Sequence, residues 1–304
     1  MDRLIERIDE LKSPVVVGLD PTEGVVPESY IKEAVEEVEL NKMAVATAYF
    51  RFGCEIIDAI ADIVPAVKPN IAFYEALGYE GIGAYIETVK YAKSKGLIVI
   101  GDIKRGDIGS TAESYATHIG FTHAAGHDFK VWCEDFVTLN PYLGYDSIEP
   151  FAKVLSELER GIFMLVKTSN KSSKDIQDLP IAYTTLGTLP LYEYVGGLVN
   201  HWGKDFVGKY GYSKIGAVVG ATHPEEGERL RHTMDNTFFL VPGYGAQGGS
   251  AADLRGFFDK NGRGCIVNSS RGIIGAWKNS SGASVGEAAR AAAISMRDDL
   301  NSVL

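Results

Sequence analysis

The chain has 304 residues, of which 45% are hydrophobic and 23% are charged, and its formal net charge is −10. That length and apolar content are enough for a large core, and α/β barrels of this size commonly form one domain. The negative charge argues against a general nucleic-acid-binding protein, because such proteins neutralise phosphates with lysine and arginine. An anionic ligand would therefore need local positive charge at its site.

Cysteine content and the start of the chain both bear on where the protein works. The three cysteines, Cys54, Cys133 and Cys265, are scattered and form no C-x-x-C motif. This predicts a reducing compartment, without disulfides or a structural zinc site. The first eight residues indicate an amphipathic helix and lack the apolar stretch of a signal peptide. Because no segment approaches the length of a membrane span, we expect a cytoplasmic protein that does not bind membranes.

Eight segments are predicted to be β-strands, and most are continuous apolar runs. Such runs are typical of parallel strands covered on both faces. Helical patterns separate them, so the chain predicts an α/β fold with a single (β/α)8 TIM-barrel domain over residues 1–304. An open doubly wound sheet is the alternative, although it would usually have fewer strands at this length. The expected strands are 15–20, 63–68, 97–104, 136–140, 161–167, 215–220, 237–242 and 264–268.

The helical patterns between these strands are less regular in length. Between the fifth and sixth strands, residues 168–188 are rich in serine, lysine, aspartate and threonine, which favours a loop. A lid and a long surface excursion are both compatible with that composition. The expected helices include 82–95, 148–158, 191–206, 224–231, 251–258 and a last helix at 285–297.

Residues 101–111 lie at the end of the third expected strand and read GDIKRGDIGST. Side chains two apart on a strand face the same way, so Asp102 and Lys104 project together. Asp107 can fold back from the following loop, which places the ammonium of Lys104 between two carboxylates that hold it protonated. Such a lysine is suited to delivering a proton to a developing carbanion. It is poorly suited to Schiff-base formation, which needs a neutral amine.

Polar residues gather at the ends of all eight expected strands. In (β/α)8 barrels, chemistry is built at the carboxyl ends of the strands. One such ending would mean little, because helix N-caps use similar residues. Eight together favour a functional site and argue against a surface charge cluster at 102–107. Examples are Asp20, Lys68, Asn70, Asn140, Ser169, Thr222, Asn268, Ser270 and Arg271.

The loop after the seventh strand, residues 243–249, reads GYGAQGG and matches the G-x-G-x-x-G dinucleotide fingerprint. The fingerprint also requires an acidic residue after the next strand, where this chain has Ser269, Ser270 and Arg271. A phosphate cradle explains the loop better, because glycines let backbone N–H groups approach an anion. The loops after strands seven and eight of such barrels often hold a phosphate. Arg271 would then bind it bidentately, and a helix-start ion pair is the alternative role for this arginine.

The D-x-K-x-x-D pattern of residues 102–107 resembles the signature of the orotidine 5′-monophosphate decarboxylase family. The continuation to Ala112 resembles the longer variant of that family, and the resemblance covers residues 15–274. It implies a TIM barrel that converts orotidine 5′-monophosphate to uridine 5′-monophosphate and carbon dioxide in de novo pyrimidine biosynthesis. No cofactor is implied. Against short family members, residues 171–212 form an insertion between strands five and six to which no role is assigned.

The resemblance also implies roles for individual residues. Lys104 is implied to protonate the C6 carbanion, with Asp102 near the departing carboxylate and with Asp107 and Lys68 holding Lys104. Asp107 and Thr111 are implied to reach the neighbouring site of a homodimer. The remaining implied contacts with the small-molecule substrate are Asp20, Ser169, Pro242, Gly245, Gln247, Ser270 and Arg271.

Two other functions fit parts of the pattern. Magnesium-dependent sugar-phosphate decarboxylases and hexulose-phosphate synthases share D-x-K-x-x-D, but they need a further carboxylate near the second strand. This chain has Lys68 and Asn70 there, with Glu75 nearby. The other alternative is a catalytically silent nucleotide-binding or scaffold protein, which the complete set of polar strand ends disfavours.

One further metal hypothesis concerns His123 and His127, which are spaced as neighbours on a helix, with Asp128 adjacent. A helical histidine pair without a convincing third ligand is more often structural or exposed. We therefore predict no metal site.

Overall fold

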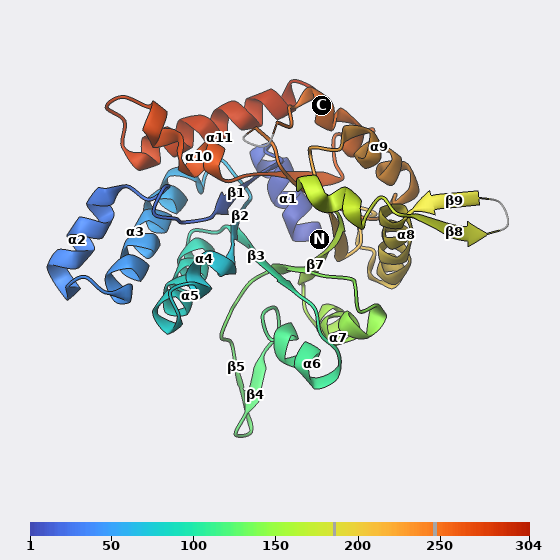
Figure 1. The fold of residues 1–304 in the computed structure, drawn as a ribbon, viewed down its shortest axis with the longest axis horizontal. Helices are drawn as coiled ribbons and strands as arrows, with labels where there is room; N and C mark the ends of the chain where they lie inside the picture. The colour runs from blue at the N-terminus through green and yellow to red at the C-terminus, as the bar shows by residue number, and fades with distance from the viewer. Residues whose placement is uncertain (185–186, 246–247) are drawn as a thin grey trace.

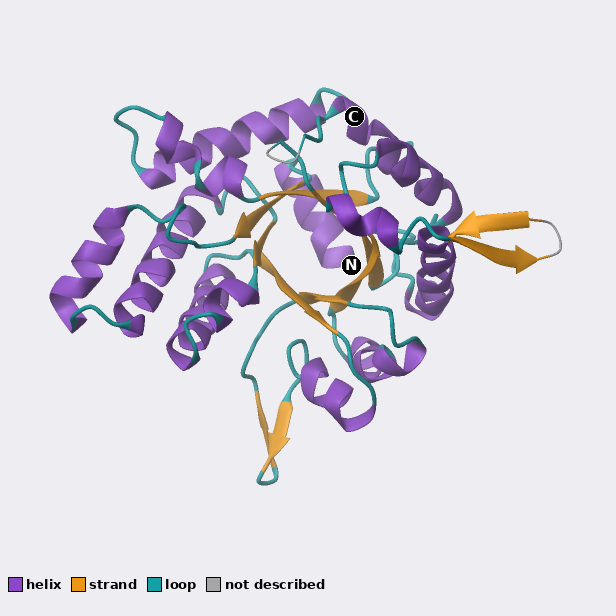
Figure 2. Cartoon of the chain, viewed as in Figure 1, coloured by secondary structure: helices purple, strands orange, loops and turns teal. Residues whose placement is uncertain are grey.

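A computed structural model of the chain describes residues 1–184, 187–245 and 248–304. At its centre, eight parallel strands form a closed barrel in the order β1-β12-β11-β10-β7-β6-β3-β2, ringed by helices (Figures 1 and 2). The predicted (β/α)8 barrel is therefore confirmed. Its strands are β1 (Val15–Leu19), β2 (Ala66–Pro69), β3 (Ile98–Arg105), β6 (Phe136–Leu139), β7 (Gly161–Lys167), β10 (Ile215–Val219), β11 (Phe239–Pro242) and β12 (Cys265–Ser269).

Each barrel strand coincides with an expected strand, with small shifts at the ends. Strand β1 is buried at every position, because one face meets the barrel interior and the other meets the helices. The second strand begins at Ala66 rather than at Ile63. Ile63 and Val64 are buried, but their backbone N–H groups donate to Ile60 in the turn after a helix. Their apolar character thus reflects core packing outside the ladder.

Helix α1 (Asp2–Leu11) closes the amino-terminal end of the barrel. Its buried residues Leu4 and Ile5 pack in one cluster with Ile98 and Phe136, the first residues of β3 and β6. In the end-on view, α1 lies behind the centre of the ring of strands (Figure 2). The opposite, carboxyl-terminal end of the barrel is left for a site.

Five helices of the described outer layer fall outside the expected ranges: α2 (Glu28–Val38), α3 (Lys42–Ile60), α4 (Ile71–Glu75), α6 (Gly109–Ala116) and α10 (Arg271–Ile274). One expected α-helix, 251–258, is instead the 3₁₀-helix η4 (Ala252–Phe257). That segment is short and includes Gly256, which has low helix propensity and lies against the Glu228 side chain. No helix within the described ranges is long and apolar enough to cross a membrane. The outer helices are α2 (Glu28–Val38), α3 (Lys42–Ile60), α4 (Ile71–Glu75), α5 (Tyr79–Ser94), α6 (Gly109–Ala116), α7 (Glu149–Glu157), α8 (Leu191–Gly203), α9 (Pro224–Thr233), α10 (Arg271–Ile274) and α11 (Val285–Asn301).

A β-hairpin of β4 (Thr122–Ala124) and β5 (His127–Phe129) projects from the barrel beside α6 (Figure 1). His123 and His127 therefore lie on a hairpin, and the helical interpretation of their spacing was wrong. The turn between the strands, Ala125 and Gly126, has positive φ at both positions, as two-residue hairpin loops require. The Nδ1 atom of exposed His123 lies 2.9 Å from Oδ1 of Asp128.

Between the fifth and sixth barrel strands, β7 and β10, the chain contains the helix expected of a βα unit and a further segment before that helix. Helix α8 returns the chain to β10, as the helix of an ordinary βα unit does. Before it, the 3₁₀-helix η2 (Lys171–Asp175) is followed by a second hairpin, β8 (Pro180–Thr184) with β9 (Gly187–Pro190), that projects outward (Figure 2). The short 3₁₀-helix η3 (Lys204–Phe206) follows α8. Within residues 171–212, the described part outside the barrel repeat is thus 171–184 with 187–190, which form the additional segment.

Candidate active site

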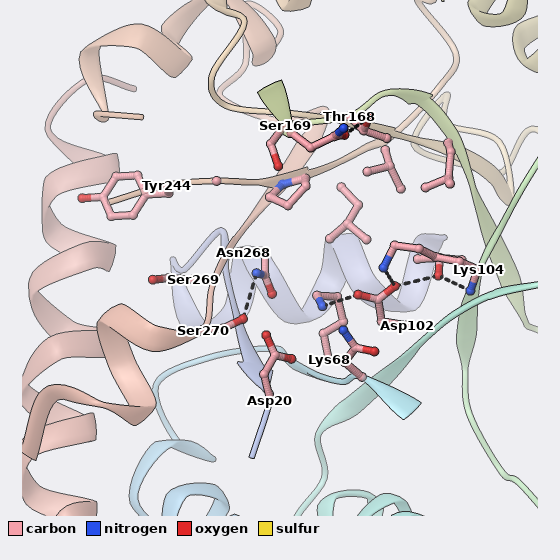
Figure 3. A pocket seen from close by; sticks show the side chains of 18 of the residues that line it. Asp20, Lys68, Asp102, Lys104, Thr168, Ser169, Tyr244, Asn268, Ser269 and Ser270 are labelled. Carbon is pink, nitrogen blue, oxygen red and sulfur yellow. Dashed lines mark hydrogen bonds and ion pairs between the residues drawn. The ribbon is translucent and has the colours of Figure 1, made fainter. Parts of the chain in front are cut away.

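A pocket of about 530 Å³ opens where the carboxyl ends of the barrel strands meet. Eight of the residues expected at the site line it, and they come from six different strands or strand ends (Figure 3). Those eight are Asp20, Lys68, Asp102, Lys104, Ser169, Pro242, Ser270 and Arg271. The rest of the lining is formed by Asn70, Thr138, Leu165, Thr168, Asn170, Gln177, Val218, Leu240, Gly243, Tyr244, Asn268 and Ser269.

Asp102 is the centre of a charged array at one side of the pocket. Its Oδ2 accepts a hydrogen bond from Nζ of Lys68 at 2.7 Å, and its Oδ1 accepts one from Nζ of Lys104 at 2.5 Å (Figure 3). The hydroxyl of Thr138 also donates to Oδ1 at 2.9 Å. Both carboxylate oxygens are therefore engaged, and the side chain is fixed between the two ammonium groups.

Burial and charge act in opposite directions on this array. Burial alone would raise the pKa of Asp102, but the ammonium groups of Lys68 and Lys104 outweigh it and hold that pKa well below its usual range. Burial alone would lower the pKa of Lys68, yet Asp102 and Asp20 outweigh it and the pKa of Lys68 is raised. At neutral pH the site therefore holds an ionised Asp102 against a charged, buried Lys68.

The backbone of β3 is irregular where it carries Lys104. The pairing of β3 with β6 shifts register between Gly101 and Arg105, and Lys104 has φ of 46°. A non-glycine residue in this left-handed region costs about 1–2 kcal/mol. The Thr138 hydroxyl stabilises the distortion, because it accepts hydrogen bonds from the backbone N–H groups of Ile103 and Lys104 at 3.1 and 3.0 Å.

Two buried polar atoms on the pocket wall formed by the ends of β1 and β12 have no hydrogen-bond partner among the described residues. They are Oδ1 of Asp20 and Oδ1 of Asn268, and both side chains line the pocket (Figure 3). An unpartnered buried acceptor costs about 1–3 kcal/mol. A ligand that presents hydroxyl or N–H groups to this wall would satisfy them.

The end of the pocket near β11 and β12 has the features of an anion site. Gly243 and Gly245 have φ of 107° and 70°, conformations that glycine adopts without steric cost. Arg271 is exposed at the start of α10, and no ion pair joins it to another residue in the described ranges. This disfavours the structural role of a helix-start ion pair. Gly245 itself does not line the pocket, and Gln247 lies outside the described residues.

Asp107 does not complete the array within this chain. It is half-buried, its Oδ1 accepts a hydrogen bond from its neighbour Ile108 N at 2.8 Å, and it does not line the pocket. Thr111 is exposed on α6 and is also outside the pocket. The arrangement is thus a carboxylate between two lysines, rather than the expected lysine between two carboxylates.

The model of the family described as "Orotidine 5′-phosphate decarboxylase / HUMPS family" matches residues 13–284 of this chain. The chain belongs to this family. An orotidine 5′-phosphate decarboxylase of Clostridium kluyveri is 44% identical over 302 residues, which cover 99% of this chain and 96% of the relative. One of Clostridium perfringens strain 13 is 42% identical over 304 residues, covering 100% and 98%. A solved structure of the Leishmania donovani OMP decarboxylase matches with a TM-score of 0.75 and 30% identity, covering 99% and 97%.

Membership in this decarboxylase family confirms the resemblance found in the sequence and the predicted class of carboxy-lyase. Two residues that line the pocket and that the sequence patterns did not single out are Thr138 and Gln177. Thr138 stands in the otherwise apolar strand FVTL, and that isolated hydroxyl was the available signal. For Gln177, which reaches the pocket from the additional segment, the sequence offered no signal.

Proposed function

We propose that this chain decarboxylates orotidine 5′-monophosphate to uridine 5′-monophosphate. One observation carries the proposal: the Lys68–Asp102–Lys104 array and the glycine-rich loop with Arg271 line a single pocket. The first can act on a carboxylated ring and the second can hold a phosphate. The names of the relatives support the same reaction.

Lys104 is the proton donor of the proposed mechanism. The bond from C6 of the pyrimidine to the carboxylate carbon breaks, carbon dioxide leaves, and the electron pair stays on C6. The Lys104 ammonium stabilises this charge and then transfers a proton from Nζ to C6. Solvent afterwards restores the proton to the amine. Asp102 and Lys68 fix the position of Lys104, and no cofactor takes part.

The phosphate end contributes through binding energy. Contacts far from the reacting atom accelerate a reaction when they are expressed at the transition state. Arg271, together with the loop that contains Gln247, would hold the phosphate. Asp20 and Lys68 would lie against the ribose, and Ser169 against the pyrimidine.

Replacing Arg271 with alanine is expected to weaken binding of uridine 5′-monophosphate by roughly 10- to 100-fold, the loss for a charge-assisted hydrogen bond. Binding of uridine, which lacks the phosphate, should stay the same. Calorimetric titration of both ligands checks this. An equal loss for both ligands would contradict the role, and so would unchanged affinity for the nucleotide.

The active unit is proposed to be a homodimer in the cytoplasm. Asp107 and Thr111 do not line their own pocket, and the adjacent Ile108 is 52% exposed. A second copy would cover this surface and bring both polar residues to the neighbouring site.

A magnesium-dependent sugar-phosphate enzyme is the second candidate, because the family description also covers HUMPS members. Its metal would need carboxylates that are free to bind it. Asp102 is engaged by two lysines, and Glu75 is paired with Arg105. Within the described parts of the chain, no group of three acidic, histidine or cysteine residues is arranged to hold a metal. The donor set therefore supports the metal-independent reaction.

The test is the absorbance of orotidine 5′-monophosphate incubated with purified protein and EDTA. Loss of the orotate chromophore, with formation of uridine 5′-monophosphate, is the expected result. If the chromophore persists with EDTA and is lost only when magnesium is added, the metal-independent mechanism is wrong. Turnover of sugar phosphates alone would favour the second candidate.

A further inference from the structure

The segment that follows β7 reaches back to the pocket through Gln177. The side-chain Oε1 of Gln177 accepts a hydrogen bond from the backbone N–H of Thr168 at 3.0 Å. Its Nε2 donates to the hydroxyl of Thr168 at 2.7 Å. One amide thus holds both the backbone and the side chain of Thr168, and both residues line the pocket.

Thr168 in turn constrains the side chain of Asn170. Its hydroxyl accepts from Gln177 and donates to Oδ1 of Asn170 at 2.6 Å. Ser169 lies between the two and also lines the pocket (Figure 3). Gln177 therefore sets the conformation of the three consecutive residues that form this wall.

Gln177 is itself held by backbone hydrogen bonds to η2 and α8 and by an ion pair between its neighbour Asp178 and the end of β7. Its backbone N–H donates to Ser173 O, and its carbonyl accepts from Tyr192 N at 2.9 Å. The next residue, Asp178, pairs with Lys167, which is fully buried. The Lys167 ammonium also lies 4.8 Å from the centre of the Tyr192 ring. Moving this segment away would leave a buried charge unpaired, which is strongly unfavourable, so the segment is an anchored wall rather than a free loop.

The opposite side of the same turn rests on the end of β10. Nε2 of His223 lies 3.1 Å from the carbonyl oxygen of Thr168, and the Thr222 hydroxyl donates to the carbonyl of Ser169 at 3.3 Å. A Cβ on Gly220 would be only 2.9 Å from the Ser169 backbone. The turn is thus clamped between β10 and Gln177.

We propose that Gln177 is a positioning residue for the base-binding end of the pocket. It holds Thr168 and Ser169 where they face the pyrimidine ring, and it has no part in holding the phosphate. The inference rests on the proposed function. It gives the additional segment of this chain a role in recognising the nucleobase.

The experiment compares two ligands by calorimetric titration of the full chain. In Gln177→Ala, the Kd for uridine 5′-monophosphate should rise by about tenfold, as expected when a polar partner is removed. The Kd for ribose 5-phosphate, which has no base, should change less than about twofold. That is well below the tenfold loss expected for the nucleotide, which corresponds to about 1.4 kcal/mol. Retained binding of ribose 5-phosphate also shows that the variant is folded. In the same variant, kcat/KM for orotidine 5′-monophosphate should fall by about the factor lost in nucleotide binding.

Two further variants sharpen the comparison. Gln177→Glu keeps an acceptor for Thr168 N and should recover part of the lost affinity. Lys174→Ala, an exposed position on η2, should match the wild type for both ligands.

Three outcomes would overturn the proposal. Unchanged nucleotide affinity in Gln177→Ala would do so, and so would an equal loss for ribose 5-phosphate or an equal loss in Lys174→Ala. In each of these cases the proposed function stands if the wild type turns over orotidine 5′-monophosphate. A wild type that neither turns it over nor binds uridine 5′-monophosphate would overturn both.

Discussion

Replacing Lys104 with alanine is expected to lower kcat for orotidine 5′-monophosphate by at least about 10⁴-fold. Loss of a positioned general acid accounts for about 10²–10⁴, and loss of a charge aimed at the developing carbanion accounts for about 10²–10³ more. Single-turnover kinetics with purified protein measures the effect. Turnover within about tenfold of the wild type would contradict the role, because it corresponds to less than about 1.4 kcal/mol of barrier.

The fold should survive this change. The Lys104 side chain is 50% exposed, and Asp102 keeps its pairing with buried Lys68. Urea unfolding should therefore give nearly the wild-type free energy. Lys104→Arg is the matched variant, since it keeps the positive charge on a group that does not readily release a proton. Near-normal turnover in Lys104→Arg would show that charge alone, without proton delivery, explains the site.

The ends of the barrel strands could be predicted because their chemistry is local. Asp102 and Lys104 follow a buried apolar run, and a parallel barrel brings all such ends together. That reasoning also placed Asp20, Lys68 and Arg271 at one pocket. It could not reveal the distortion at Lys104, because positive φ at that residue depends on Thr138 of the neighbouring strand.

The predictions that failed or stayed incomplete depended on the path of the chain between strands. The spacing of Asp107 allowed contact with Lys104, but the carboxylate accepts a hydrogen bond from Ile108 N instead. The four-residue spacing of His123 and His127 is compatible both with one turn of a helix and with the two strands of a tight hairpin. Gln177 lies ten residues after β7, and tertiary contacts bring it back, among them the pairing of Asp178 with Lys167 and the hydrogen bond from Tyr192 N to the Gln177 carbonyl. Contacts of this kind are set by tertiary structure, which local periodicity does not encode.

The largest expected effect on stability comes from the other end of the barrel, at Asp135. This carboxylate is 1% exposed and pairs with Lys93, Arg160 and Arg3 at 2.8, 2.6 and 3.3 Å. It also accepts a hydrogen bond from Val99 N at 3.0 Å. One residue thus connects α1, α5 and β3 with the chain that enters β7.

Replacing Asp135 with alanine should lower the free energy of unfolding by about 3–5 kcal/mol, because the three cations lose a buried partner. Asp62→Ala is the matched control. Asp62 forms a two-bond pair with Arg290, but the two side chains are 66% and 42% exposed, so its loss should cost less than about 1 kcal/mol. Urea denaturation of both variants measures the difference. Because Asp135 lies at the amino-terminal end of the barrel, the folded Asp135→Ala variant should still bind uridine 5′-monophosphate like the wild type. Equal destabilisation by the two changes would show that burial of Asp135 does not determine its contribution.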